Sequence, residues 1–174
     1  MVFPMAVMAT TECPAGNWRN AGYQDGVNGQ PVHWITRYRK ACERADSPFD
    51  RDTYLTARRE GLERYCRAYN GYELGARGAP YYGACPAKLE GDFLDAYRTG
   101  ARLHGLHRKI RALDRQIVWY EERILELTDS ARHDAAVIAE RSARFQAEID
   151  RLEEERATYL QRLELYKTRV AGIS

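Results

Sequence analysis

The clearest pattern in the chain is an apolar residue at every seventh position of its second half. Residues 106–171 contain no glycine, proline or cysteine, and alanine, glutamate, arginine and leucine dominate there. Such residues favour helix, and a sustained seven-residue spacing is typical of a coiled-coil seam. The series consists of Leu103, Ile110, Ile117, Ile124, Ala131, Ile138, Phe145, Leu152, Tyr159, Tyr166 and Ile173.

The second apolar position of each repeat shifts halfway along this region. In the first part this position lies three residues after each member of the series, at Leu106, Leu113, Tyr120 and Leu127. In the second part it lies four residues after, at Ile149, Leu163 and Val170, and Arg156 interrupts this second set. The shift falls at 128–130, a Thr-Asp-Ser run that favours helix caps. We therefore predict that residues 91–174 form an antiparallel hairpin of long charged helices. The alternative is one unbroken helix that pairs with another chain.

Shorter periodic segments in the first half predict a small helical domain over residues 13–90. One helix is expected near 17–29, and a second is expected to begin at Pro31, which suits the first turn of a helix. Asp50 or Asp52 is expected to cap a third helix, which would end at Asn70-Gly71. The whole chain is therefore predicted to be all-α.

Glycines in this first half recur at spacings that place them on helix faces. Trp18, Gly22, Gly26 and Gly29 are separated by four, four and three residues, so they share one face. Phe93 precedes Gly100 in a similar arrangement. Because glycine lets two backbones approach closely, we predict close packing at Gly22, Gly26, Gly29, Gly61, Gly71, Gly75 and Gly78.

All four cysteines, Cys13, Cys42, Cys66 and Cys85, lie in the first half. An even number in a small domain, without the paired spacing of a zinc site, favours disulfides and an oxidising compartment. Four cysteines allow three connectivities, so the pairing is not determined by counting. Our hypothesis is that neighbours in sequence pair, Cys13 with Cys42 and Cys66 with Cys85.

Charge and hydropathy exclude two classes of partner. The net charge of +2 is small and dispersed, which argues against nucleic acid. No apolar run approaches the roughly 18 residues of a transmembrane helix. Residues 1–12 are expected to be a flexible N-terminus, and the alternative is the remnant of a signal peptide.

Catalytic and metal-binding patterns are weak. His104 and His107 lie close on one helix, but no further ligand is expected one turn away, so no metal site is predicted. Nothing in the sequence brings Asp25, Glu60, Glu63 or Asp92 together as a carboxylate pair for glycoside chemistry. We therefore expect no enzymatic activity and no cofactor.

Aromatic residues near glycines and turns suggest a binding surface. Their rings can stack on sugars or pack against a partner protein, although they can equally form the core of a small domain. The candidates for ligand contact are Tyr23, Trp34, Tyr72, Tyr81 and Tyr82.

Residues 12–105 combine several short motifs: Glu-Cys, W-x3-G-Y-x-D-G-x2-G, a further Cys, G-L-x2-Y-C, N-G-x3-G-x2-G and Cys-Pro. This combination resembles an uncharacterised bacterial family, known only as a domain of unknown function, of secreted or lipid-anchored envelope proteins. The resemblance implies a location in the periplasm or outer envelope, near the outer membrane or peptidoglycan. It implies no activity.

Together these observations predict a non-enzymatic structural or assembly protein of the cell envelope. It would associate with itself or with another envelope protein through the helical seam, defined as Leu103, Ile110, Ile117, Ile124, Ile138, Phe145, Leu152, Tyr159 and Tyr166. The alternative function is a glycan-binding or peptidoglycan-binding module that uses the tyrosine-rich first domain.

Overall fold

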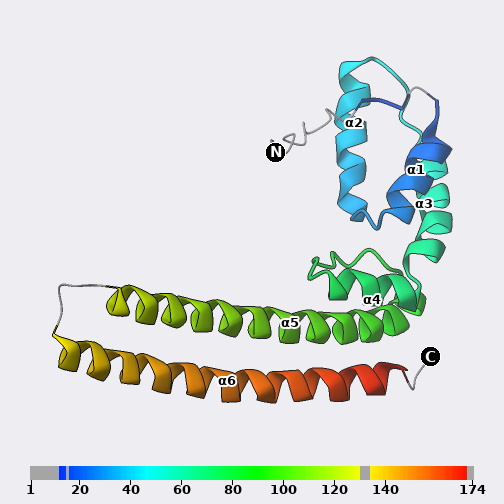
Figure 1. Cartoon of the computed structure of the whole chain (residues 1–174). Helices are drawn as coiled ribbons and strands as arrows, with labels where there is room; N and C mark the ends of the chain where they lie inside the picture. The colour runs from blue at the N-terminus through cyan, green and yellow to red at the C-terminus, as the bar shows by residue number, and fades with distance from the viewer. Residues whose placement is uncertain (1–11, 15, 130–133, 172–174) are drawn as a thin grey trace. The chain divides into compact units, whose positions relative to one another are not determined.

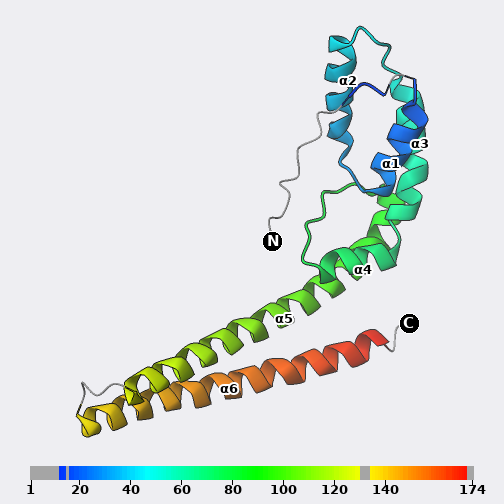
Figure 2. The same cartoon turned by 45° about the horizontal axis from the view of Figure 1, so that its top comes forward.

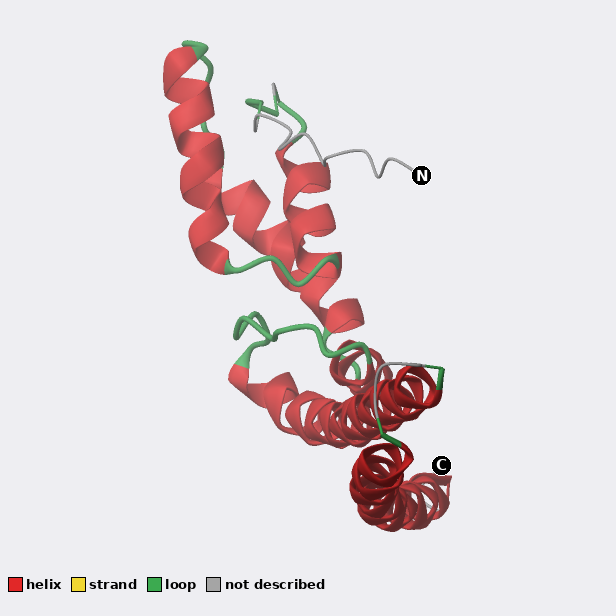
Figure 3. Cartoon of the chain, turned by 60° about the vertical axis from the view of Figure 1, so that its left-hand side comes forward, coloured by secondary structure: helices red, strands yellow, loops and turns green. Residues whose placement is uncertain are grey.

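The computed structural model describes residues 12–14, 16–129 and 134–171, and within these ranges every regular element is a helix (Figures 1 and 3). The predicted all-α class is therefore confirmed. The expectation for the N-terminal segment lies outside the described residues, apart from its last position. The elements are α1 (Trp18–Val27), η1 (Val32–Trp34), α2 (Ile35–Arg44), α3 (Arg51–Tyr65), α4 (Ala68–Ala76), α5 (Ala87–Thr128) and α6 (Ala135–Ala171).

Internal contacts divide the chain into two compact units. The described residues up to Gly100 form the first unit, and those from Ala101 onward form the second. The sequence pattern placed this division after residue 90 instead. Helix α5 explains the difference, because its first turns carry Phe93, which is fully buried in the core of the first unit.

Helices α1 and α3 of the first unit approach each other through glycine (Figures 1 and 2). A Cβ atom placed on Gly22 would lie 2.1 Å from the carbonyl oxygen of Tyr54. One placed on Gly61 would lie 2.3 Å from the carbonyl oxygen of Tyr23. The close packing predicted for these residues is therefore present, with backbone in contact with backbone.

A second crossing of the same kind joins α4 to the start of α5. A Cβ on Gly71 would lie 2.3 Å from the carbonyl oxygen of Phe93, and one on Gly100 would lie 2.1 Å from that of Tyr72. Gly100 was not among the predicted packing residues. Gly78, which was, is exposed with φ of 69° and follows the C-cap of α4, a conformation that glycine adopts readily.

The predicted boundary of the third helix is wrong at its C-terminal end. Helix α3 ends at Tyr65, and Asn70-Gly71 lies inside the next helix, α4. The side-chain amide of Asn70 donates to the carbonyl oxygens of Arg64 and Tyr65, so it caps the preceding helix instead of ending its own. Of the two residues predicted to cap this helix, Asp50 and Asp52, the cap is Asp50, whose carboxylate accepts from the Thr53 amide at 3.0 Å.

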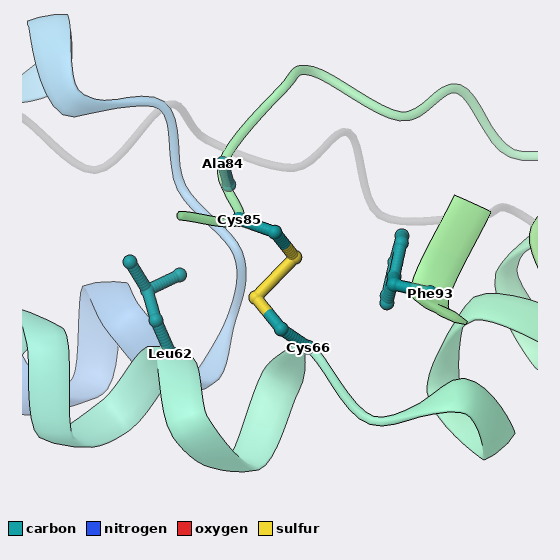
Figure 4. Packing of buried hydrophobic residues seen from close by; sticks show 5 residues of the cluster. All are labelled: Leu62, Cys66, Ala84, Cys85 and Phe93. Carbon is teal, nitrogen blue, oxygen red and sulfur yellow. A yellow bond between two sulfur atoms is a disulfide. The ribbon is translucent and has the colours of Figure 1, made fainter. Parts of the chain in front are cut away.

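Two small aromatic cores, each with one disulfide, hold the first unit together. Trp18, Cys42 and Tyr54 form one, and the Cys13–Cys42 disulfide joins it. In the other, the Cys66–Cys85 disulfide lies between Leu62 and Phe93 (Figure 4). Both pairings in our hypothesis are confirmed.

The second unit is an antiparallel helical hairpin, in which α6 returns along α5 (Figures 1 and 2). Its core consists of Leu113 and Ile117 from α5 with Ile149 and Leu152 from α6. The alternative of one unbroken helix is therefore wrong. Every residue of the helical seam is buried or half-buried, so the seam is closed within the chain.

Arg156, which interrupts the second apolar position of the repeat, pairs with Asp114 across the hairpin. Both side chains are 42% exposed, and exposed ion pairs contribute less than about 1 kcal/mol. A leucine at position 156 would extend the core and bury more apolar area, worth roughly 1–2 kcal/mol. We expect Arg156→Leu to raise the midpoint of thermal unfolding of the hairpin. An unchanged or lower midpoint in calorimetry would show that the ion pair contributes more than its exposure suggests.

Candidate functional site

A buried carboxylate links three helices of the first unit. Asp25, on α1, is only 9% exposed. Its Oδ2 accepts a hydrogen bond from the hydroxyl of Tyr54 on α3 at 2.7 Å, and its Oδ1 lies 3.5 Å from the donor hydroxyl of Tyr38 on α2. Asp25, which precedes the packing residue Gly26, thus places a buried polar group beside the glycine crossing.

Arg58, also on α3, continues this buried polar cluster toward the surface. Its side chain is 6% exposed, and its Nη2 donates to the carbonyl oxygen of Gln30 at 2.5 Å. This bond holds the turn that follows α1, where Gly29 adopts a φ of 64°. The ring of Tyr65 occupies the space where a side chain at position 29 would lie.

Burial raises the pKa of Asp25, because the loss of hydration outweighs the hydrogen bonds from Tyr54 and Tyr38. A raised folded-state pKa means that the carboxyl stabilises the fold fully below its unfolded value of about 3.9. That contribution is lost as the pH rises through the folded-state pKa. We expect the free energy of unfolding, relative to Asp25→Asn, to fall as the pH rises from about 4 toward neutrality. Denaturant titrations of both proteins across this range test it, and a constant difference would contradict it.

The turn after α1 forms one wall of a groove of about 540 Å³ in the first unit. Helix α4 and the segment that follows it form the other wall. This volume is within the roughly 300–1,000 Å³ range of small-molecule sites. Its principal lining side chains are Asn28, Gln30, Tyr65, Asn70, Glu73, Arg77 and Tyr82.

The lining of this groove suits a polar, nearly neutral ligand. Tyr82 is 66% exposed and Tyr65 is half-buried, so two aromatic rings border the cavity. Glu73 lies on α4 and Arg77 is the C-cap residue of that helix. Neither forms an ion pair with a described residue. One acid, one base and three amides offer many hydrogen bonds and little net charge.

The structure separates the five aromatic residues predicted to contact a ligand. Tyr82 alone of the five lines the groove. Tyr81 is half-buried and packs against the core, because its ring lies 4.9 Å from that of Phe93 and its hydroxyl contacts Glu90 and the Cys85 amide. Its ring and hydroxyl thus make contacts within the first unit, and it does not line the groove. The other three, Tyr23, Trp34 and Tyr72, are half-buried and lie outside the groove.

The carboxylates and histidines considered for chemistry have separate surroundings. Glu60 pairs with Arg19, Glu63 and Asp92 are exposed, and Asp25 is in the buried cluster. His104 and His107 are half-buried on α5, whereas His133 lies outside the described residues. In the part of the chain that the structure describes, no three His, Cys, Asp or Glu residues are grouped to hold a metal ion.

Comparison with known proteins gives a family match for residues of the groove-bearing unit. No helix in the described ranges is long and apolar enough to cross a membrane. No curated protein and no solved structure matched the chain. Residues 17–102, which include both glycine crossings, the buried cluster and the groove, match the family described as Protein of unknown function (DUF2799).

Proposed function

We propose that this chain is a non-catalytic component of the bacterial cell envelope, and that the groove of its first unit binds a glycan. Two disulfides support an oxidising, extracytoplasmic location. Because the helical seam is buried within the hairpin, it offers no ready surface to another chain. The groove is therefore the better candidate for ligand recognition.

The observation that carries the proposal is the exposed ring of Tyr82 beside a polar cavity. The flat face of a sugar ring packs on an aromatic side chain, and its hydroxyls pair with amides and charged groups. Tyr82 supplies the ring, while Asn28, Gln30, Glu73 and Arg77 supply the polar groups. Peptidoglycan fragments carry both features and are the glycans of the proposed compartment.

Calorimetric titration of the full chain with soluble peptidoglycan disaccharide fragments tests this function. We expect saturable binding that Tyr82→Ala weakens about tenfold, since loss of one stacked ring costs on the order of 1.4 kcal/mol. Tyr69→Ala is the matched control, because Tyr69 is 71% exposed but does not line the groove. Absence of binding, or an equal loss in both variants, would refute glycan recognition at this site.

A second candidate is self-assembly, in which two copies exchange α6. The heptad spacing favours this exchange. Ile124 on α5 and Ile138 on α6 are separated by two seven-residue repeats, so one unbroken heptad series runs through both helices. The same apolar side chains would then pair between chains. Light scattering over a range of concentrations distinguishes the two states, and a monomer throughout would refute exchange.

A further inference from the structure

Two charged side chains, Glu73 and Arg77, line the groove of the first unit, and its other lining residues are uncharged. Glu73 is half-buried and Arg77 is exposed. Neither forms an ion pair with a described residue. A half-buried carboxylate without a charged partner has lost hydration that nothing in the described chain replaces, and a positive group of a ligand would offset that loss.

The spacing of these two residues would ordinarily let them pair with each other. The Arg77 amide donates to the Glu73 carbonyl oxygen at 3.1 Å, and Arg77 keeps right-handed helical backbone angles, so helical geometry extends from one residue to the other. A glutamate four residues before an arginine is the favourable order for a helical ion pair, and Glu140 and Arg144 of α6 have this order and are paired. Glu73 and Arg77 instead line the cavity as two separate charges.

The charge of Arg77 also acts on an aromatic ring of the groove. Burial raises the pKa of Tyr65, and the positive charge of Arg77 opposes that rise. The ring of Tyr65 packs on Gly29, in the turn after α1 that forms the other wall. A negative group of a ligand that entered between these walls would therefore be attracted by Arg77.

We propose that the ligand of this groove is a glycan that bears a short peptide, in which an amine of the peptide pairs with Glu73 and a carboxylate pairs with Arg77. This inference rests on the proposed function, because Tyr82 still supplies the stacking surface for the sugar. A peptidoglycan fragment with its stem peptide carries all three features: a sugar, a free amine and a free carboxylate. A sulfated or phosphorylated glycan would satisfy Arg77 but would bring negative charge toward Glu73.

Calorimetric titration of the full chain with a peptidoglycan disaccharide that carries its stem peptide tests this assignment. We expect Glu73→Gln and Arg77→Gln each to weaken binding about tenfold, the effect of losing one hydrogen bond between charged groups. Acetylation of the peptide amine should abolish the effect of Glu73→Gln, and amidation of the peptide carboxylates should abolish that of Arg77→Gln. Two changes that disrupt the same contact do not add, so this result would link each side chain to its ligand group.

The matched controls are Glu63→Gln and Arg67→Gln. These two residues have the same order and spacing, belong to the same unit and are exposed, but they do not line the groove. Both variants should bind the peptide-bearing ligand as tightly as the native chain. A loss equal to that of the groove variants would reduce the effect to net charge and overturn the proposal. A loss in Glu73→Gln that persists with the acetylated ligand would overturn it as well.

A neutral disaccharide, in which the lactyl carboxyl group is amidated, separates this inference from the proposed function. If it binds as tightly as the peptide-bearing ligand and Tyr82→Ala weakens it, glycan recognition stands and the role of the two charges is refuted. If the peptide-bearing ligand shows the expected losses but Tyr82→Ala binds it normally, the two charges recognise the peptide and the proposed recognition of a sugar fails. Absence of binding by both ligands overturns both proposals.

Discussion

Gly22→Ala is expected to destabilise the first unit by about 3 kcal/mol, at the upper end of the cost of overpacking a core. The added methyl group would lie 2.1 Å from the carbonyl oxygen of Tyr54, which is backbone and cannot rotate away. Helices α1 and α3 would have to separate, which would open the core around Trp18 and lengthen the hydrogen bond between Asp25 and Tyr54. Urea unfolding, followed by near-ultraviolet circular dichroism of the buried aromatic residues, measures the loss.

Gly91→Ala is the matched control for this effect. Gly91 is also helical and belongs to the first unit, but a Cβ placed there meets nothing within 4 Å. Because alanine favours helix over glycine by roughly 1 kcal/mol, this change should raise the free energy of unfolding. A decrease in the free energy of unfolding for Gly22→Ala and an increase for Gly91→Ala would show that contact with the facing backbone decides the effect of the added methyl group. A Gly22→Ala variant as stable as the native chain would contradict the close crossing.

The helical hairpin could be predicted from the sequence because the pattern that specifies it repeats every seven residues. The heptad series indicates helix at each step, and the shift of its companion positions indicates that the second helix returns along the first. The disulfide pairs were predictable for a simpler reason, since pairing neighbours closes the shortest loops. Each resulting core also contains its own aromatic residues, Trp18 in one and Phe93 in the other.

The features that were missed depend on contacts between segments distant in sequence. Asn70-Gly71 has the composition of a helix end, yet Asn70 caps the helix before it and Gly71 faces Phe93. Tyr81 and Tyr82 are adjacent in sequence, but one ring packs against Phe93 of the core and the other borders the groove. Local composition cannot distinguish such neighbours, because the fold decides which side of the chain faces inward.

The groove could be predicted only in part for the same reason. Gly29 and Tyr82 were singled out by their residue types, whereas Glu73 and Arg77 resemble any pair of charges on a solvated helix. They become a candidate site because they line the same cavity as the turn after α1. The ring of Tyr65, the last residue of α3, packs on Gly29 of that turn. A hydrogen bond from Arg58 to Gln30 then holds the turn in place.

Reduction of both disulfides is expected to unfold the first unit while the hairpin remains helical. Cys13–Cys42 and Cys66–Cys85 close loops with sequence separations of 29 and 19 residues. In the chain-entropy model each loop contributes about 3 kcal/mol. A combined loss of about 6 kcal/mol is comparable to the whole stability of a small domain. The second unit contains no cysteine and keeps its own core, so it should not respond to reductant directly.

Circular dichroism before and after reduction measures this difference between the units. The near-ultraviolet signal of the buried first-unit aromatic residues should disappear, whereas a large part of the far-ultraviolet helical signal should persist. Separate double substitutions, Cys13→Ala with Cys42→Ala and Cys66→Ala with Cys85→Ala, assign the loss to each loop. The second pair should cost more than its loop closure alone, because Cys66 and Cys85 are 5% and 8% exposed and pack against Phe93. If the near-ultraviolet signal survived full reduction, the aromatic cores and glycine crossings would suffice without the disulfides, and the argument for an oxidising compartment would lose its physical basis.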